Sequence, residues 1–182
     1  MGGDRKNGGE NSPVPPPFSA TPPLQAVRVR RAEARDAGAL LALVAALNRD
    51  QGDPDDILTE QALSRDLIGN AIVIVAEAPD QALVGYATGH PTYETGHAEK
   101  GVYVGDLYVT PEHRRQGIAR ALLAAMARAG HTQGARHLWL TAREANTAAH
   151  AFYRRLGAKG EGVMAFAVVY QDFLNLAAEK PR

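Results

Sequence analysis

The stretch VGDLYVTPEHRRQGIARALLAAMARAG, residues 104–130, decides the fold of this chain. Its first residues are β-branched, aromatic or small, which predicts a buried strand, and Pro111 ends that strand because proline cannot donate to a ladder. Farther along, Ile118, Leu122 and Met126 recur every four residues among alanines, which predicts a helix. We therefore expect a strand, a basic loop and a helix in succession, with the glycine at the end of the stretch closing the helix.

The loop between this strand and this helix is a candidate anion site. A loop that leads into a helix directs free backbone N–H groups and the positive end of the helix dipole at one point. Three arginines, Arg114, Arg115 and Arg120, flank that point, and Gly117 among them permits close approach of the backbone. The loop is not a Walker loop, since no Lys-Ser/Thr follows Gly117, and no G-x-G-x-x-G follows a predicted strand.

This arrangement resembles the acetyl-CoA pyrophosphate loop of the GNAT superfamily of N-acetyltransferases. The resemblance rests on Arg114-x-x-Gly117-x-Ala119, and on Asn146 with residues 151–158, which resemble the second signature of that superfamily. It covers roughly residues 27–178 and is greatest with the diamine (spermidine/spermine) and thialysine N-acetyltransferase branch. It implies an enzyme that moves the acetyl group of acetyl-CoA to a primary amine of a small molecule by direct attack.

The resemblance also implies roles for individual residues. In GNAT enzymes the pantetheine lies along the key strand, and backbone N–H groups of the loop cradle the pyrophosphate. The expected coenzyme-binding residues are Leu107, Tyr108, Val109, Arg114, Arg115, Gln116, Gly117, Ile118, Ala119, Arg120 and Asn146. Tyr153 is the expected general acid for the leaving thiolate. The alternatives are a plain helix cap for Asn146, an ordinary buried tyrosine for Tyr153 and solvated surface charges for the arginines.

The acceptor side is less defined. Asp106, Glu94 and Glu161 are the expected acceptor-binding residues. The general base stays unassigned, because these three carboxylates, Glu144, His90, His97 and a chain of waters are all candidates. The diamine branch usually carries Glu-Asp in the key strand, whereas this chain has Gly-Asp at 105–106. Four aspartates at positions 50, 53, 55 and 56 could make an amine site acidic or form a solvated turn.

Two other functions stay open on the sequence. A protein or peptide acetyltransferase, acting on a lysine or an N-terminus, would need an open groove for an extended peptide. A non-catalytic acyl-CoA-binding module would keep the arginine and glycine loop and lose the acid. A homodimer is expected from the family resemblance and from the apolar run 163–169.

Composition narrows the classes of partner and compartment. The net charge is zero, which argues against nucleic-acid or anionic-membrane partners, and there is no cysteine for a disulfide, a thiolate nucleophile or a Cys-based zinc site. We expect no metal, no membrane span and a cytoplasmic location. Residues 1–26 hold six of the eleven prolines and almost no apolar side chains, which predicts a disordered tail before a domain at 27–182.

The order of the expected elements defines the fold class. Strands are predicted at 27–31, 72–76, 83–88, 104–109, 136–141 and 163–170, and helices at 36–47, 59–67, 118–130, 146–156 and 171–178. Residues 90–100 are expected to form a loop. The sequence therefore predicts an α/β fold with a mixed central sheet of about six to seven strands and helices on both faces, as GNAT folds are built.

Overall fold

The computed structural model describes residues 27–180, which form two compact units, residues 27–141 and residues 142–180. The predicted tail at 1–26 lies outside the described residues. The first unit contains the whole sheet and the helices packed on it. No helix of the described residues is long and apolar enough to cross a membrane.

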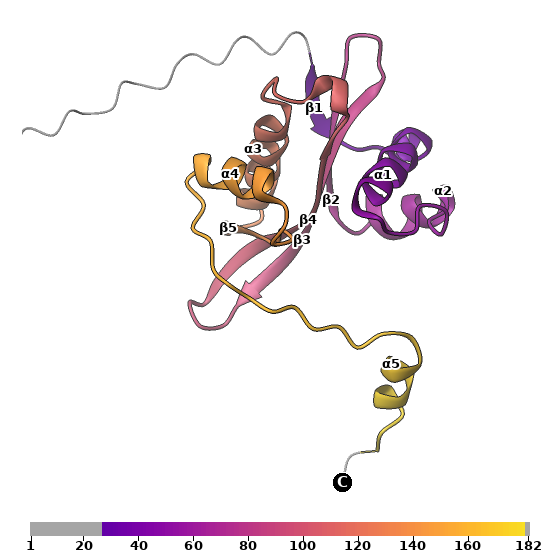
Figure 1. The fold of residues 1–182 in the computed structure, drawn as a ribbon, viewed down its shortest axis with the longest axis vertical. Coiled ribbons are helices and arrows are strands. Elements are labelled where there is room, and N and C mark those ends of the chain that lie inside the picture. The colour runs from indigo at the N-terminus through magenta and orange to yellow at the C-terminus, as the bar shows by residue number, and fades with distance from the viewer. Residues whose placement is uncertain (1–26, 181–182) are drawn as a thin grey trace, which may run out of the picture. The chain divides into compact units, whose positions relative to one another are not determined.

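The sheet of the first unit has five strands in the order β1-β2-β3-β4-β5 (Figure 1). Their bounds are β1 Arg28–Arg31, β2 Ile72–Glu77, β3 Leu83–Glu94, β4 Glu99–Val109 and β5 Ala135–Leu140. The first four strands pair antiparallel and β5 pairs parallel with β4. A parallel pair needs a crossover connection, and a helix after β4 supplies it. The expected mixed α/β sheet is confirmed, with five strands in place of six to seven.

Helices cover both faces of this sheet (Figure 1). One face carries α1 (Ala37–Gln51) and α2 (Glu60–Ala62), the latter continued by a π-helix at Leu63–Ile68, and the other face carries α3 (Ile118–His131). The core on the α1 face joins one stripe of the helix to alternate residues of the strands, as the two periodicities require. Its buried members include Leu40, Leu43, Leu63, Val73, Val75, Tyr86 and Tyr108.

Helix α3 confirms the four-residue spacing expected from the sequence, because Ile118, Leu122 and Met126 are all buried. Gly130, expected to close the helix, lies inside it. A Cβ built on Gly130 would lie 2.6 Å from Cγ2 of Val102. The glycine therefore lets the helix end pack closely on β4.

The expected loop at 90–100 is wrong, because β3 and β4 extend through it as a long hairpin that turns at residues 95–98. Pro91 hid this strand from the sequence pattern. The last β2–β3 pair is Ile72 with Gly89, so Pro91 lies where β3 has a partner on one side only. Proline is tolerated on such an edge, where one face of the backbone makes no ladder bonds.

Asp36, expected to cap the helix at 36–47, makes no side-chain capping bond to α1. Its carboxylate accepts instead from Arg30, at 2.7 and 2.9 Å, and from the N–H of Glu33 at 2.7 Å. The hydrogen bonds from Arg30, and then the bond from Glu33, hold the pKa of Asp36 below its usual range despite burial. The residue thus ties the chain before α1 to strand β1.

The second unit contains α4 (Thr147–Arg155) and α5 (Tyr170–Ala177), which confirm the two expected helices. The expected strand at 163–170 is wrong, since residues 158–169 form neither helix nor strand. A strand needs a neighbour to bond with, and residues 142–180 contain no other strand. Large apolar side chains of this segment are exposed: Val163, Met164, Phe166, Val168 and Val169.

Candidate active site

Strands β4 and β5 separate near the middle of β4. Their ladder ends at Val104 opposite Leu140, whereas β4 runs on to Val109. The cause is a β-bulge. Gly89 pairs with Val104 and Ala87 pairs with Leu107, so two residues of β4 lie opposite one residue of β3. A bulge bends its strand and increases the local twist, which turns the end of β4 away from β5.

Thr88 holds this bulge in place. Its hydroxyl accepts from the N–H of Asp106 at 2.9 Å and donates to the Asp106 carboxylate at 2.9 Å. Thr88 is itself buried. The carboxylate of Asp106 is therefore fixed beside the point where the two strands separate. The role of Thr88 could not be predicted from the sequence, because its partner depends on the register of the hairpin.

The end of β4 presents unpaired backbone groups. The N–H of Thr110 donates to the carbonyl of Val84 at 3.0 Å, so bonded pairs fall on every second residue back along β4. Leu107 and Val109 occupy the positions between, where N–H and C=O point away from β3. No strand of the 27–141 unit lies opposite them on that side. An extended chain could add there as a strand does.

Arg114 is committed to other groups of the protein. Its Nε donates to the carbonyl of Val109 at 2.9 Å, and its Nη2 donates to the carboxylate of Asp50 at 2.9 Å. The guanidinium also lies 5.6 Å from the ring centroid of Tyr108. The first contact fills the outward carbonyl of Val109, as the ladder pattern requires. The side chain expected to contact phosphates is thus held against β4 and α1.

The basic loop leads into α3 through backbone conformations that favour glycine. Gly117 is the N-cap of α3 with φ 84°, and Arg115 has φ 65°. No side chain caps this helix and its first turn contains no acidic residue. Its first N–H groups therefore lack intrahelical acceptors. The positive charge of Arg120 in the first turn is repelled by the positive end of the helix dipole. An anion bound at this end of the helix would compensate both charges.

The remaining loop residues divide into two groups. The side chains of Arg115, Gln116 and Arg120 are exposed, and within residues 27–180 neither arginine makes an ion pair. Ile118 points into the core, so it and Ala119 can contribute only backbone N–H groups to a ligand. The loop thus combines two accessible cations with a row of donors.

The face of β4 beside the separation point carries polar and aromatic groups. Tyr108 belongs to the core on the α1 face, and strand alternation places Asp106 on the same face. Tyr103 lies 5.3 Å from Trp139, centroid to centroid, and its hydroxyl is 3.3 Å from that of Thr141. The sequence singled out neither aromatic residue for a site. The parallel register of β4 and β5 brings them together.

Tyr86 carries a buried hydroxyl that makes no hydrogen bond within the described residues. Burial, and then the nearby carboxylate of Asp106, raises the pKa of this hydroxyl. The phenol therefore stays protonated at neutral pH and adds no charge to the site.

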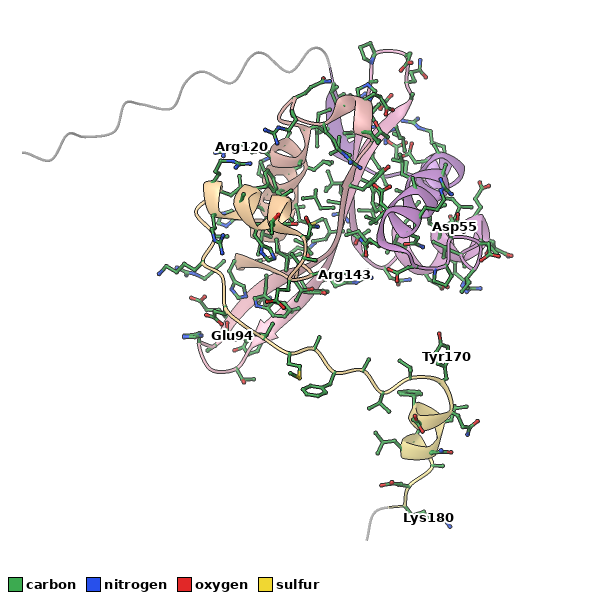
Figure 2. The ribbon with its side chains drawn as sticks, in the orientation of Figure 1. Asp55, Glu94, Arg120, Arg143, Tyr170 and Lys180 are labelled. Atoms are coloured by element: carbon green, nitrogen blue, oxygen red, sulfur yellow. The ribbon has the colours of Figure 1, made fainter. Side chains whose placement is uncertain are left out.

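Of the three carboxylates expected to bind the acceptor, the two in the 27–141 unit, Asp106 and Glu94, lie apart. Figure 2 shows Glu94 at the tip of the β3–β4 hairpin, well separated from Arg120 at the start of α3. Glu94 pairs there with His97 at 2.7 Å. Glu161 lies in the other unit, exposed in the segment without helix or strand. Within the 27–141 unit, Asp106 lies beside the open end of β4 and Glu94 does not.

The second unit holds the two remaining expected residues. Asn146 is the N-cap of α4, and its side chain accepts from the N–H of Ala149 at 3.1 Å. Tyr153 lies near the end of α4, half-buried, with its ring 5.3 Å from that of Phe152. Burial raises the pKa of the Tyr153 hydroxyl. Gly157, with φ 90°, follows the helix end as expected.

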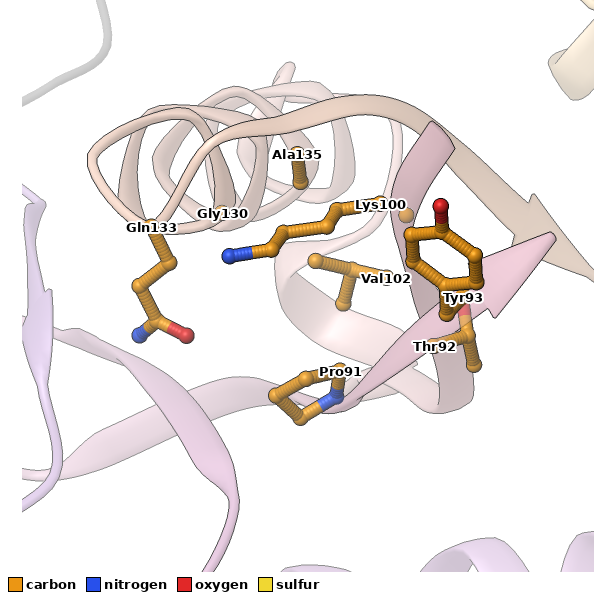
Figure 3. A pocket seen from close by; sticks show the side chains of 9 residues that line it. Pro91, Thr92, Tyr93, Lys100, Val102, Gly130, Gln133 and Ala135 are labelled. Carbon is orange, nitrogen blue, oxygen red and sulfur yellow. The ribbon is translucent and has the colours of Figure 1, made fainter. Parts of the chain in front are cut away.

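A pocket of about 390 Å³ lies elsewhere in the first unit, between the outer part of the hairpin and the end of α3. Figure 3 shows Lys100 extending across it toward Gln133, above Val102. None of the expected site residues lines this pocket. This pocket lies at the hairpin end of the sheet, away from the open end of β4.

The open strand end, the bulge and the uncapped helix after a basic loop lie together in the 27–141 unit. Comparison with known families shows the class of the protein. The sequence model of the acetyltransferase (GNAT) family matches residues 40–158. The chain belongs to this family and is an acetyl-CoA-dependent N-acetyltransferase.

Several named proteins are similar to this chain over most of its length. Thialysine N-epsilon-acetyltransferase of Bos taurus is 28% identical over 144 residues, covering 73% of this chain and 84% of that protein. An aminoglycoside acetyltransferase, meta-AAC0020, from an uncultured soil metagenomic sample superposes with a TM-score of 0.68 at 21% identity, covering 79% and 97%. Aminoglycoside N-acetyltransferase AAC(6')-Iy in complex with CoA gives 0.65 at 23%, covering 78% and 93%. The two structures show the fold.

Proposed function

We propose that this enzyme moves the acetyl group of acetyl-CoA to a primary amine of a small molecule by direct attack. The observation that carries the proposal is the unpaired end of β4 beside the basic loop. An added strand at Leu107 and Val109 and an anion at the helix N-terminus are the two contacts that an acyl-CoA needs. The residues present therefore fit acetyl-CoA as the co-substrate.

In this proposal the main contribution of the protein is to hold and orient the coenzyme. The N–H of Leu107 or Val109 donates to the thioester oxygen, where negative charge develops during attack, and such a donor stabilises the transition state. The N–H groups of residues 115–120, with Arg115 and Arg120, hold the pyrophosphate. Holding the coenzyme this way converts a bimolecular encounter into reaction within a complex.

The amine would bind on the α1 face of β4. The carboxylate of Asp106 attracts an ammonium group, and the rings of Tyr103 and Trp139 offer further favourable faces to a cation. The amine must lose a proton before it attacks. Asp106 or a water that it holds can take this proton, because Thr88 leaves one carboxylate oxygen available.

Tyr153 is the proposed general acid for the departing thiolate of CoA. Its raised pKa keeps the proton on the hydroxyl at neutral pH, as an acid requires. In GNAT enzymes the matching tyrosine lies near the coenzyme sulfur. The proposal includes Asn146 as a further coenzyme contact and a cytoplasmic location.

The relatives support a small amine as the acceptor. One is named for thialysine, and solved structures with the same fold are named for aminoglycosides. Both kinds of molecule carry primary amines. The exposed acidic loop after α1 suits a cationic acceptor.

A panel of amines tests the proposal. Isothermal titration with acetyl-CoA is set beside a CoA-release assay on thialysine, polyamines, aminoglycosides and lysine-containing peptides. We expect acetyl-CoA binding and turnover on at least one of the small amines. Turnover confined to peptides would replace the proposed acceptor with a protein. Binding without any turnover would indicate a non-catalytic acyl-CoA-binding module.

Replacing the carboxylate of Asp106 should weaken acceptor use. Asp106→Asn keeps the size of the side chain and the backbone bond to Thr88, but it removes the charge that an ammonium needs. We expect kcat/KM for the best amine to fall by about 10-fold to 100-fold, as for loss of a hydrogen bond to a charged group. Acetyl-CoA affinity and Tm should stay unchanged. An unaltered kcat/KM would remove Asp106 from the acceptor site.

The proposal also includes a homodimer. Large apolar side chains from Val163 to Val169, with Phe173 and Leu174 in α5, are exposed, and apolar groups gathered on a surface can mark an interface with another chain. Sedimentation at micromolar concentration should give a dimer. Charged replacements at Phe166 and Val168 should shift it toward monomer, and a monomer in the unchanged protein would contradict the prediction.

A further inference from the structure

Arg114 joins three parts of the site with one side chain. It bonds to the carbonyl at the end of β4, it lies over the ring of Tyr108, and it pairs with Asp50 in the last turn of α1. Asp50 and Arg114 are 64 residues apart in the chain. The pair therefore connects the strand expected to hold the coenzyme to the helix that covers the acceptor face.

The last turn of α1, which contains Asp50, is bonded to the acidic loop at 52–56 through Asn48 and Arg49. Gly52 ends α1 with φ 74°, and the N–H of Asp53 donates to the carbonyl of Asn48 at 2.9 Å. The Asn48 side chain donates to the carbonyl of Pro54 at 2.9 Å, and Arg49 pairs with Asp55 at 2.7 Å. Whatever fixes the last turn of α1 thus also fixes the loop that follows it.

The Asp50–Arg114 pair contributes little to global stability. The two side chains are 50% and 46% exposed, and exposed ion pairs are typically weak because water screens them. The Arg114 side chain is long and makes two further contacts, with the carbonyl of Val109 and the ring of Tyr108. Its weak ion pair with Asp50 can therefore form and break while the rest of the side chain stays in place. The Asp50–Arg114 pair would instead couple the ordering of the coenzyme site to the ordering of the acceptor site.

We propose that Arg114 is a positioning residue, through which acetyl-CoA bound at β4 and the basic loop orders the acidic loop at 52–56 through Asp50. This rests on the proposed function. A coenzyme that adds along Leu107 and Val109 and fills the loop at 115–120 fixes both backbone segments that flank Arg114. The fixed guanidinium then holds Asp50, and the amine meets a loop whose ordering has already occurred. Coupling of this kind is reciprocal, so the amine strengthens coenzyme binding by the same factor.

Hydrogen exchange with CoA as the probe tests this without knowledge of the acceptor. In the unchanged protein, saturating CoA should slow exchange of the amides at 52–56 by about 5-fold or more, the lower range of allosteric coupling. Asp50→Asn should abolish that slowing while CoA affinity, measured by titration, changes little. Asp50→Glu keeps a carboxylate and should restore part of it.

Asp56→Asn is the matched control, because it removes the same charge from the same loop and the structure gives Asp56 no hydrogen bond or ion pair to another described residue. It should retain the full slowing. With the best amine of the panel, Asp50→Asn should raise KM and leave kcat nearly unchanged. Failure of CoA to bind the unchanged protein would overturn the proposed function itself. CoA binding without slower exchange at 52–56, or slowing that persists in Asp50→Asn, would overturn this inference alone.

Discussion

A protein carrying Gly117→Glu should fold and fail to bind acetyl-CoA. Gly117 starts α3 with φ 84°, so a side chain there is strained, at a cost of about 1–2 kcal/mol. The larger effect is electrostatic. A carboxylate about 4 Å from a phosphate in a partly screened site meets a repulsion of about 4 kcal/mol, which corresponds to a loss of affinity of about a thousandfold. Isothermal titration with acetyl-CoA measures it.

Gly134→Glu separates charge at the site from backbone strain. Gly134 has φ 87°, close to that of Gly117, but it lies after the other end of α3. The Tm of the Gly134→Glu protein should fall by about as much as that of the Gly117→Glu protein, while its affinity for acetyl-CoA stays normal. Unchanged affinity in a folded Gly117→Glu protein would remove the loop from the coenzyme site.

Tyr153→Phe should slow acetyl transfer by about 10²-fold to 10⁴-fold, the usual contribution of a general acid. The change removes one hydroxyl and keeps the ring that packs beside Phe152. Burial raises the pKa of the hydroxyl above its usual value, so the acid form persists through neutral and mildly alkaline pH. The wild-type rate should therefore not fall through ionisation of Tyr153 in that range. Acetyl-CoA affinity should hardly change.

The measurement should be a single turnover on the best amine, because product release can mask a slower chemical step. Tyr170→Phe removes the same group from an exposed tyrosine of the same unit and serves as the control. It should transfer acetyl at the wild-type rate. An equal rate for Tyr153→Phe would falsify the general-acid role.

Local pattern was sufficient to predict most of the helices and strands. The spacing of Ile118, Leu122 and Met126 predicted α3 correctly because a helix is defined by contacts four residues apart. The loop before it was predicted for the same reason, since its arginines and Gly117 are adjacent in the chain. The missed hairpin extension depended on which side of β3 is unpaired at Pro91, and local sequence does not contain that fact.

The site was predictable only where it is local. That Arg114 lies in the loop was predictable, but its pairing with Asp50 depends on how α1 packs against β4. Asp106 was recognised as a candidate, whereas its contact with Thr88 follows from a bulge that only the hairpin register reveals. The prediction of a sixth strand at 163–170 was wrong for a related reason. These residues have strand-forming side chains, but a strand also requires a partner strand.

The bulge in β4 also bears on aggregation. Unpaired strand edges invite other chains to pair with them, and proteins limit the hazard by keeping such edges short or blocked. Within the 27–141 unit, the run of β4 without a partner on this side begins after Val104 and ends at Val109, whose outward carbonyl Arg114 already occupies. What stays open is a few backbone groups, fewer than an ordinary strand of five to six residues would use. One extra residue in a strand thus gives the enzyme an edge long enough for a slender thioester arm and too short to seed assembly of the sheet with a foreign strand.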